Sequence, residues 1–221
     1  MEIAPDETVR FVRAVAPDPD GVQEEMADYA DETGFPTVGH EVGATLRMAA
    51  RMVDAERVFE FGSGYGYSAY WFAEALPEDG EIVLTEHDED ELAMAREYMD
   101  RGGFDGLARY EAGDALDAIE RYEGPFDVVL IDHQKHRYRE GFDAVREKVS
   151  PGGVVVADNA MKAGVIRTEK LLAILEGEDP DDVNEHTRGI ADYLLTVRDD
   201  PDFETVVLPL GEGIAVSYRT A

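Results

Sequence analysis

The fold is decided by one stretch in the first third of the chain, Val58-Phe59-Glu60-Phe61-Gly62-Ser63-Gly64-Tyr65-Gly66-Tyr67-Ser68. A short apolar run, typical of a buried strand, leads directly into alternating glycines and then into a helical pattern. Glycines at such a junction let the main chain turn sharply and let a ligand approach the backbone closely. The stretch therefore predicts a cofactor-binding loop between a strand and a helix. A loop that merely turns the chain is the alternative interpretation.

The rest of the chain continues the alternation of strands and helices. We expect further strands at 82–86, 108–112, 126–132 and 153–159, and an amphipathic helix at 88–101. Nearly continuous apolar strands are typical of a parallel sheet that is covered on both faces. The pattern predicts an α/β fold with a doubly wound, Rossmann-like sheet.

The end of the chain departs from this alternation. Two strand-like runs, 203–210 and 213–219, are joined by Gly211-Glu212-Gly213, which indicates a hairpin. We therefore predict a seven-stranded, mostly parallel sheet with a C-terminal antiparallel hairpin. Rossmann-like methyltransferases end in this way, whereas nucleotide-binding dehydrogenases usually do not. We expect one domain over residues 1–221, with the helical segment 1–53 covering the active site.

Composition limits the class of protein. The chain has 221 residues and no cysteine, so disulfides, thiolate metal sites and cysteine nucleophiles are excluded. The formal charge of −30, from 50 acidic and 20 basic residues, opposes binding to nucleic acid. The acids are dispersed, which favours a hydrated coat suited to a high-salt cytoplasm over a surface for basic partners. We expect a cytoplasmic protein with no membrane-spanning segment and no signal peptide.

Polar side chains follow two neighbouring strands of the predicted sheet. Asp132 ends one strand, and Asp158 and Asn159 end the next. Carboxyl ends of adjacent parallel strands meet at the ligand crevice, so these three side chains should converge. Their oxygen donors suit Mg²⁺, or alternatively Mn²⁺ or Ca²⁺, better than zinc. His133 and His136 could indicate a softer metal, and acids at strand ends can simply cap helices.

The glycine loop favours S-adenosylmethionine over a dinucleotide. Gly62-x-Gly64-x-Gly66 differs from the dinucleotide fingerprint, and adenosylmethionine carries cations instead of phosphates. Glu60 is an acid suited to those cations. Glu86, at the end of the second strand, is placed to accept hydrogen bonds from both ribose hydroxyls. Asp114, followed by Ala115, could accept from the adenine amino group, could cap a helix, or could do both.

Taken together, these motifs resemble the metal-dependent O-methyltransferase family that includes catechol and caffeoyl-coenzyme A O-methyltransferases. The resemblance spans residues 37–219. It rests on Val38-Gly39, the segment 60–68, Glu86, Asp132-His133-x-Lys135-x-Arg137-Tyr138 and Asp158-Asn159.

The resemblance implies roles for individual residues. Asp132, Asp158 and Asn159 would be metal ligands, and Lys135 the general base, with a polar surface lysine as the alternative. The cofactor would be contacted by Val38, Glu60, Gly62, Gly64, Ser68, Glu86, Asp114, Ala115, Asp132 and His133. The acceptor would be a small vicinal-dihydroxy, catechol-like molecule, and family members suggest a homodimer.

The expected chemistry explains these residue types. A free phenol has a pKa of about 10 and is a poor nucleophile at neutral pH. A divalent cation favours the oxyanion, and a lysine beside it can take the proton. Paired hydroxyls can both bind the metal, which aligns one of them for direct methyl displacement.

Departures from the catechol branch concern the acceptor. Gln134 and Ala163 stand where that branch has tryptophan and proline, and His136 replaces an acid. Glu185 lies near the expected position of the acid that binds the second hydroxyl. The acceptor ring could be held by Phe35, Pro36, Met161 or Tyr193, each of which could equally be a core residue.

Two other functions remain possible at this point. A nicotinamide-dependent oxidoreductase explains the glycine loop and Glu86 but not Asp158-Asn159 or the terminal hairpin. A non-catalytic protein that binds adenosylmethionine would not need Asp132, Lys135 and Asp158 together.

Overall fold

A computed structural model describes residues 3–220, and its centre is a seven-stranded sheet in the order β3-β2-β1-β4-β5-β7-β6. The strands are β1 (Arg57–Phe61), β2 (Glu81–Glu86), β3 (Ala108–Ala112), β4 (Phe126–Ile131), β5 (Val149–Ala157), β6 (Phe203–Leu208) and β7 (Ile214–Arg219). Strands β1 to β5 pair in parallel, and β7 is antiparallel to both of its neighbours, β5 and β6. The predicted fold class and hairpin are confirmed.

Alternation along each strand divides the core into two layers. On β4, Val128 and Leu130 pack into one apolar cluster, and Val129 and Ile131 pack into the other. All four side chains are fully buried, because both faces of a parallel sheet are covered. β5 starts at Val149, before the expected 153, and a register shift interrupts its pairing with β4.

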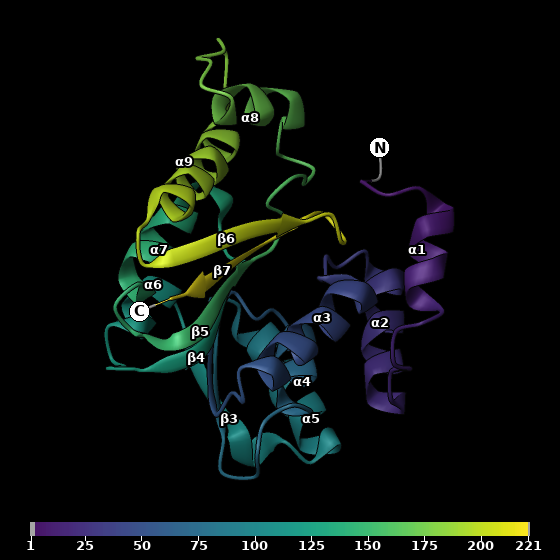
Figure 1. The fold of residues 1–221 in the computed structure, drawn as a ribbon. Coiled ribbons are helices and arrows are strands. Elements are labelled where there is room, and N and C mark those ends of the chain that lie inside the picture. Colours follow the sequence, from purple (N-terminus) through teal and green to yellow (C-terminus); the bar gives the residue numbers. More distant parts are fainter. Residues whose placement is uncertain (1–2, 221) are drawn as a thin grey trace.

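Helices cover both faces of the sheet (Figure 1). On one face lie α2 (Gly21–Thr33), α3 (Gly39–Met52), α4 (Tyr67–Ala73) and α5 (Glu89–Gly102), with α1 (Asp6–Arg13) outside them. On the other face lie α6 (Ala115–Ile119), α7 (Tyr138–Val145), α8 (Thr168–Leu175) and α9 (Glu185–Asp199). Two short 3₁₀ turns, η1 (Asp105–Leu107) and η2 (Lys135–Arg137), complete the described elements.

A short loop separates the second and third helices of the N-terminal part. The helix α2 ends at Gly34 in a left-handed conformation with φ of 72°, and α3 begins at Gly39. The segment 35–38 between them lines the main cavity described below. Within residues 3–220, no helix combines the length and apolarity that crossing a membrane requires.

Candidate active site

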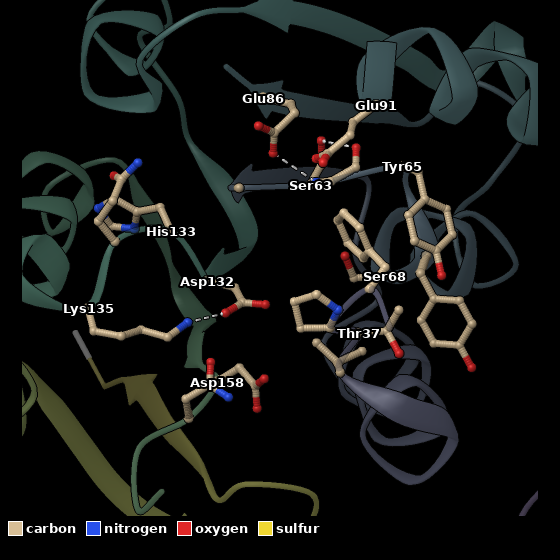
Figure 2. A pocket seen from close by; sticks show the side chains of 18 of the residues that line it. Thr37, Ser63, Tyr65, Ser68, Glu86, Glu91, Asp132, His133, Lys135 and Asp158 are labelled. Atoms are coloured by element: carbon tan, nitrogen blue, oxygen red, sulfur yellow. Dashed lines mark hydrogen bonds and ion pairs between the residues drawn. The ribbon is translucent and has the colours of Figure 1, made fainter. Parts of the chain in front are cut away.

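A cavity of about 610 Å³ opens at the carboxyl ends of β1, β2, β4 and β5. Most of the predicted site residues line it, namely Val38, Gly62, Gly64, Ser68, Glu86, Asp132, His133, Lys135, Asp158 and Asn159. Figure 2 shows Asp132, Asp158 and Lys135 on one side of this space, with Thr37 and Ser68 on the other. The sheet therefore brings together side chains that are up to about 120 residues apart in the sequence, from Val38 to Asn159.

The glycine loop is closed by its own hydrogen bonds. The N–H groups of Gly62 and Ser63 donate to the Thr85 hydroxyl and carbonyl at 3.3 and 2.9 Å. Gly64 N–H donates to the Glu86 carboxylate at 3.0 Å, and Gly66 N–H donates to the Ser63 carbonyl at 2.9 Å. Backbone N–H groups of this kind bind pyrophosphate in dinucleotide-binding loops. Here these four N–H groups already donate to oxygen atoms of the protein itself.

Gly62 is required by the space around it as well as by its φ of 82°. A Cβ atom there would lie 2.8 Å from the Asp132 carbonyl oxygen. The main chain after β4 therefore packs directly on the main chain after β1. This close approach is one reason why the loop and the Asp132 segment form a single cavity wall.

Glu86 is held by the backbone. Its Oε1 accepts hydrogen bonds from His87 N–H and Asp88 N–H at 2.7 and 3.0 Å, and its Oε2 accepts from Gly64 N–H. The His87 ring also lies against this carboxylate, with Nδ1 2.5 Å from Oε1, so the protein engages most of the roughly four acceptor positions of the group. The ribose contact stays a prediction.

Glu60 lies behind the cavity wall instead of lining it. Its side chain is fully buried, and neither carboxylate oxygen has a hydrogen-bond partner. Burial raises the pKa of this carboxyl to about 8, with the Asp132 charge adding to the rise and nearby Ser68 opposing it. Glu60 is therefore mostly protonated at neutral pH in this state.

Asp114 and Ala115 border a smaller adjoining cavity of about 100 Å³, which shares Gly62, Glu86 and His133 with the main one. Asp114 caps α6 by accepting from Leu116 N–H at 2.9 Å. It also accepts from the Arg137 guanidinium at 2.7 Å, and this ion pair is the main cause of its lowered pKa. The helix-cap interpretation is confirmed, and the second oxygen is engaged by Arg137.

Lys135 points at the Asp132 carboxylate and not at solvent. Its Nζ donates to Asp132 Oδ1 at 2.7 Å (Figure 2). It also donates to the Tyr138 hydroxyl at 2.9 Å. Tyr138 is fully buried, and its hydroxyl lies 3.3 Å from the same Asp132 oxygen. The ammonium is thus held at the cavity wall by the buried Tyr138 and the half-buried Asp132, which argues against the surface-lysine alternative.

Asp158 has a buried carboxyl group with one unpartnered oxygen. It is 4% exposed, and its Oδ1 has no hydrogen-bond partner. Burial, followed by repulsion from Asp132, raises its pKa well above the usual range. The pKa of Asp132 is also raised by burial, against the opposing effect of Lys135. Two such carboxylates at one site require a cation or a proton between them.

Asn159 adopts a positive φ of 55°, a conformation that asparagine tolerates better than most residues. Its amide donates to Glu212 Oε2 at 2.8 Å, which leaves the amide oxygen free for another partner. Glu212 lies in the turn between β6 and β7 and also lines the cavity. It was not predicted, because the sequence indicated only a turn at that position.

His133 contributes an uncharged ring to the cavity wall. Burial lowers its pKa to about 4, and neither ring nitrogen has a partner. The ring stacks on Tyr138 at a centroid distance of 5.4 Å, with 15° between the planes. It therefore presents a flat, neutral surface where a cofactor contact was predicted.

The other acceptor-side expectations give a mixed result. Phe35 and Pro36 line the cavity, but Met161 does not, and Tyr193 is fully buried in the core. Glu185 lies at the start of α9, outside the cavity. Glu212 lines the cavity, and Glu185 does not.

The charge of the cavity favours cations. It is lined by five acids, Glu86, Glu91, Asp132, Asp158 and Glu212, and by one lysine, Lys135. Together with the occupied glycine-loop donors, this balance disfavours the pyrophosphate of a nicotinamide dinucleotide. It suits a ligand that carries positive charge and a divalent metal ion.

Comparison with known proteins agrees with this geometry. The chain is 33% identical over 144 residues to a catechol O-methyltransferase of Niastella koreensis. The aligned region covers 62% of this chain and 65% of that protein, so the chain spans just under two thirds of the relative's length. It is 24% identical over 193 residues to caffeoyl-CoA O-methyltransferase 2 of Populus trichocarpa, covering 83% and 74% of the two chains.

A solved structure shares the fold over nearly its whole length. The O-methyltransferase TomG from Streptomyces achromogenes, involved in tomaymycin synthesis and solved with SAM, has a TM-score of 0.81 and 25% identity, covering 96% of this chain and 95% of that one. The model of the O-methyltransferase family matches residues 23–220. The resemblance inferred from the sequence is thereby confirmed, and the chain belongs to the O-methyltransferase family.

Proposed function

We propose that this protein transfers a methyl group from S-adenosylmethionine to one hydroxyl of a small vicinal-dihydroxy acceptor, assisted by a divalent metal ion. The observation that carries the proposal is the convergence of Asp132, Lys135, Asp158 and Asn159 at one wall of an acidic cavity. Family membership supports the reaction type. The metal and the acceptor class rest on the site's own chemistry.

The cofactor would lie along the glycine loop. Glu86 would accept from the ribose, the neutral His133 ring would pack beside the adenosine, and Val38 would close over the methionine end. The sulfonium and ammonium groups would be stabilised by the acids around the cavity. When bound, adenosylmethionine supplies an electrophilic methyl group. The helical segment that ends in the 35–38 loop would cover this side of the site.

The donor set fits a hard divalent cation. Asp132 and Asp158 supply carboxylate oxygens, Asn159 has a free amide oxygen, and Asp158 Oδ1 is buried with no partner from the protein. Oxygen ligands of this kind are those of Mg²⁺, Mn²⁺ and Ca²⁺. A bound metal would lower the pKa of an acceptor hydroxyl and hold two adjacent hydroxyls in a fixed orientation.

Lys135 is suited to move the acceptor's proton. Its Nζ is held by Asp132 and Tyr138 at hydrogen-bond distance, so its position at the cavity wall is fixed before the acceptor binds. A lysine that loses its own proton in this site can take one from the hydroxyl and pass it to solvent. The acceptor oxyanion would then attack the methyl carbon of adenosylmethionine, so that an O–C bond forms while the S–C bond breaks and S-adenosylhomocysteine leaves, with no covalent intermediate on the protein.

A methyl-transfer assay tests the proposal. Purified protein in molar salt is given adenosylmethionine and a panel of aromatic vicinal diols, with matched monophenols as controls. We expect turnover of diols that falls about 10²-fold or more with EDTA and returns with Mg²⁺, because the metal contributes several kcal/mol to the reaction. Turnover that survives chelation would remove the metal role.

Two variants separate the metal site from general surface charge. Asp158→Asn removes one buried carboxylate at constant size, and Asp179→Asn removes an acid that is 92% exposed. We expect the first to abolish stimulation by Mg²⁺ and the second to leave it unchanged. Equal behaviour of the two variants would contradict the assignment of Asp158. Calorimetric binding of NAD in place of adenosylmethionine would instead support an oxidoreductase.

A further inference from the structure

A second group of metal-binding side chains lies outside the cavity, where η2 meets the start of α9. His136 comes from η2, and Glu185 and His186 come from the first turn of α9. One ligand atom from each residue lies within 4.8 Å of the other two. None of the three lines the main cavity. The group is therefore distinct from the Asp132 and Asp158 site.

The backbone fixes this meeting point. A Cβ atom at Gly189 would lie 2.4 Å from the His136 Cα and 2.6 Å from the Lys135 carbonyl oxygen. The main chain of η2 therefore packs directly on α9 at Gly189, one turn after Glu185. The first turn of α9 is itself fixed, because the Asn184 side chain accepts from Thr187 N–H at 2.8 Å.

The three side chains gather without hydrogen-bonding one another. The His136 and His186 rings lie edge to face, with centroids 5.5 Å apart. The closest approach of Glu185 to His186 is 3.8 Å, from Oε1 to Nε2, which is too long for a hydrogen bond. The Nδ1 atom of His186 is buried and has no partner. Imidazole nitrogens and a carboxylate oxygen therefore lie close together without hydrogen-bonding one another, and they could bind a metal ion.

The ligand types select a different metal from that of the active site. Two imidazole nitrogens and one carboxylate oxygen match zinc and similar borderline cations, which keep a fourth position for water. Bonds of about 2.1 Å in a tetrahedron place ligand atoms about 3.4 Å apart. His136 and Glu185 are exposed, so their rotamers can contract the present spacing to that value.

The surrounding charge attracts a cation to this point. The α8–α9 connection carries Glu176, Glu178, Asp179, Asp181 and Asp182. It reaches α9 through Asp179, whose Oδ1 lies 3.6 Å from the Arg188 guanidinium. Asp182 is paired with Arg167 and Lys170, and Asp179 with Arg188, so these five acids exceed the three bases by two charges. The net negative charge that remains raises the local concentration of divalent ions.

We propose that His136, Glu185 and His186 bind a zinc-class divalent metal that links η2 to α9. Because η2 also carries Lys135, a metal at this position fixes the loop that presents the lysine to the active site. The proposal concerns a site separate from the methyl-transfer centre and does not require that centre to bind metal.

Metal titration of the full-length protein tests this proposal. Protein in molar potassium chloride with excess Mg²⁺, which occupies oxygen-only sites, is titrated with Co²⁺ and followed by visible absorption, and zinc content is measured by atomic emission after dialysis. We expect one equivalent of Co²⁺ to bind with the absorption of a tetrahedral nitrogen–oxygen site, and zinc to displace it.

Matched variants locate the bound ion. We expect His136→Gln and His186→Gln each to weaken Co²⁺ binding at least about tenfold, since loss of a second-shell partner alone costs that much, and Glu185→Gln to weaken it as well. His40→Gln, whose ring contacts the Pro17 carbonyl, and Asp158→Asn should retain the signal. Circular dichroism checks that each variant is folded. Absence of binding, or binding that is lost in Asp158→Asn but kept in the two histidine variants, would overturn the proposal.

Discussion

The buried Glu60 carboxyl should make the stability of this protein fall as pH rises. Its side chain is fully buried without a hydrogen-bond partner, and burial raises its pKa from 4.5 to about 8. The unfolded chain releases this proton near pH 4.5, whereas the folded chain holds it until about pH 8. Between these values the folded state binds more protons, so the free energy of unfolding decreases with pH.

The size of the effect follows from the two pKa values. Relative to acid conditions, Glu60 lowers the free energy of unfolding by about 2 kcal/mol at pH 6 and by about 5 kcal/mol at pH 9. A Glu60→Gln substitution keeps the shape of the side chain and removes its titration. The stability of the variant minus that of the native protein should therefore increase by about 3 kcal/mol between pH 6 and pH 9.

Denaturant unfolding in constant molar salt measures this difference. Groups that titrate in both proteins cancel in the comparison, so only Glu60 contributes. The matched control is Glu24→Gln, at an exposed position in α2, for which the difference should not change with pH. A stability difference for Glu60→Gln that is equally flat would show that the carboxyl is ionised in the folded protein, and would refute the reasoning.

Four further predictions follow from the site and the composition. At pH 7 a carboxyl with a pKa of about 8 is about 90% protonated, so binding of the cationic cofactor should release up to about 0.9 proton. Calorimetry in two buffers of different ionisation enthalpy measures this release, which should be absent in Glu60→Gln. Lys135→Met should lower kcat about 10²–10⁴-fold in steady-state assays, and native turnover would remove its role as base. Gly62→Ala should lower the Tm by several degrees more than Gly103→Ala. Both substitutions place alanine at a positive φ, which costs about 1–2 kcal/mol. Only the Cβ atom at position 62 would also lie 2.8 Å from a main-chain oxygen, whereas the Cβ atom at position 103 would meet no atom within 4 Å. Equal shifts of the Tm in thermal melts would contradict this prediction. Dilution from molar salt to millimolar buffer should unfold the chain of net charge −30, and an unchanged circular dichroism spectrum would disprove it.

The strands and the convergence of the strand-end acids could be predicted because both depend on local patterns. Buried strands are continuous apolar runs, and residues that follow adjacent parallel strands must lie together. The start of β5 was placed too late, at 153 instead of Val149, because Pro151-Gly152-Gly153 resembles a turn. A homodimer and a high-salt habitat stay predictions.

The remainder of the site depends on distant contacts that no local pattern carries. Glu212 reaches the cavity only because β7 pairs with β5, which brings a hairpin turn beside Asn159. Glu60 lies two residues before Gly62, which lines the cavity, but the sequence could not show that its carboxyl lies behind the wall. The cluster of His136, Glu185 and His186 depends on the packing of η2 against Gly189, which only the folded chain shows.

The terminal hairpin is joined to the site by more than one bond. Ala160 N–H donates to the Gly213 carbonyl at 2.7 Å, Lys162 N–H donates to the Glu212 carbonyl at 2.9 Å, and the Asn159 amide donates to the Glu212 carboxylate. The loops after β1 and β2 are joined to each other through Thr85 and Glu86. The hairpin turn also lies against the start of α3, since a Cβ atom at Gly211 would lie 2.9 Å from Val42 Cγ2 and 3.4 Å from the Val38 carbonyl oxygen. A change in the length or sequence of the 209–213 turn would therefore move the Asn159 wall and the Val38 wall of the cavity together, so that one surface loop sets the width of the space between them.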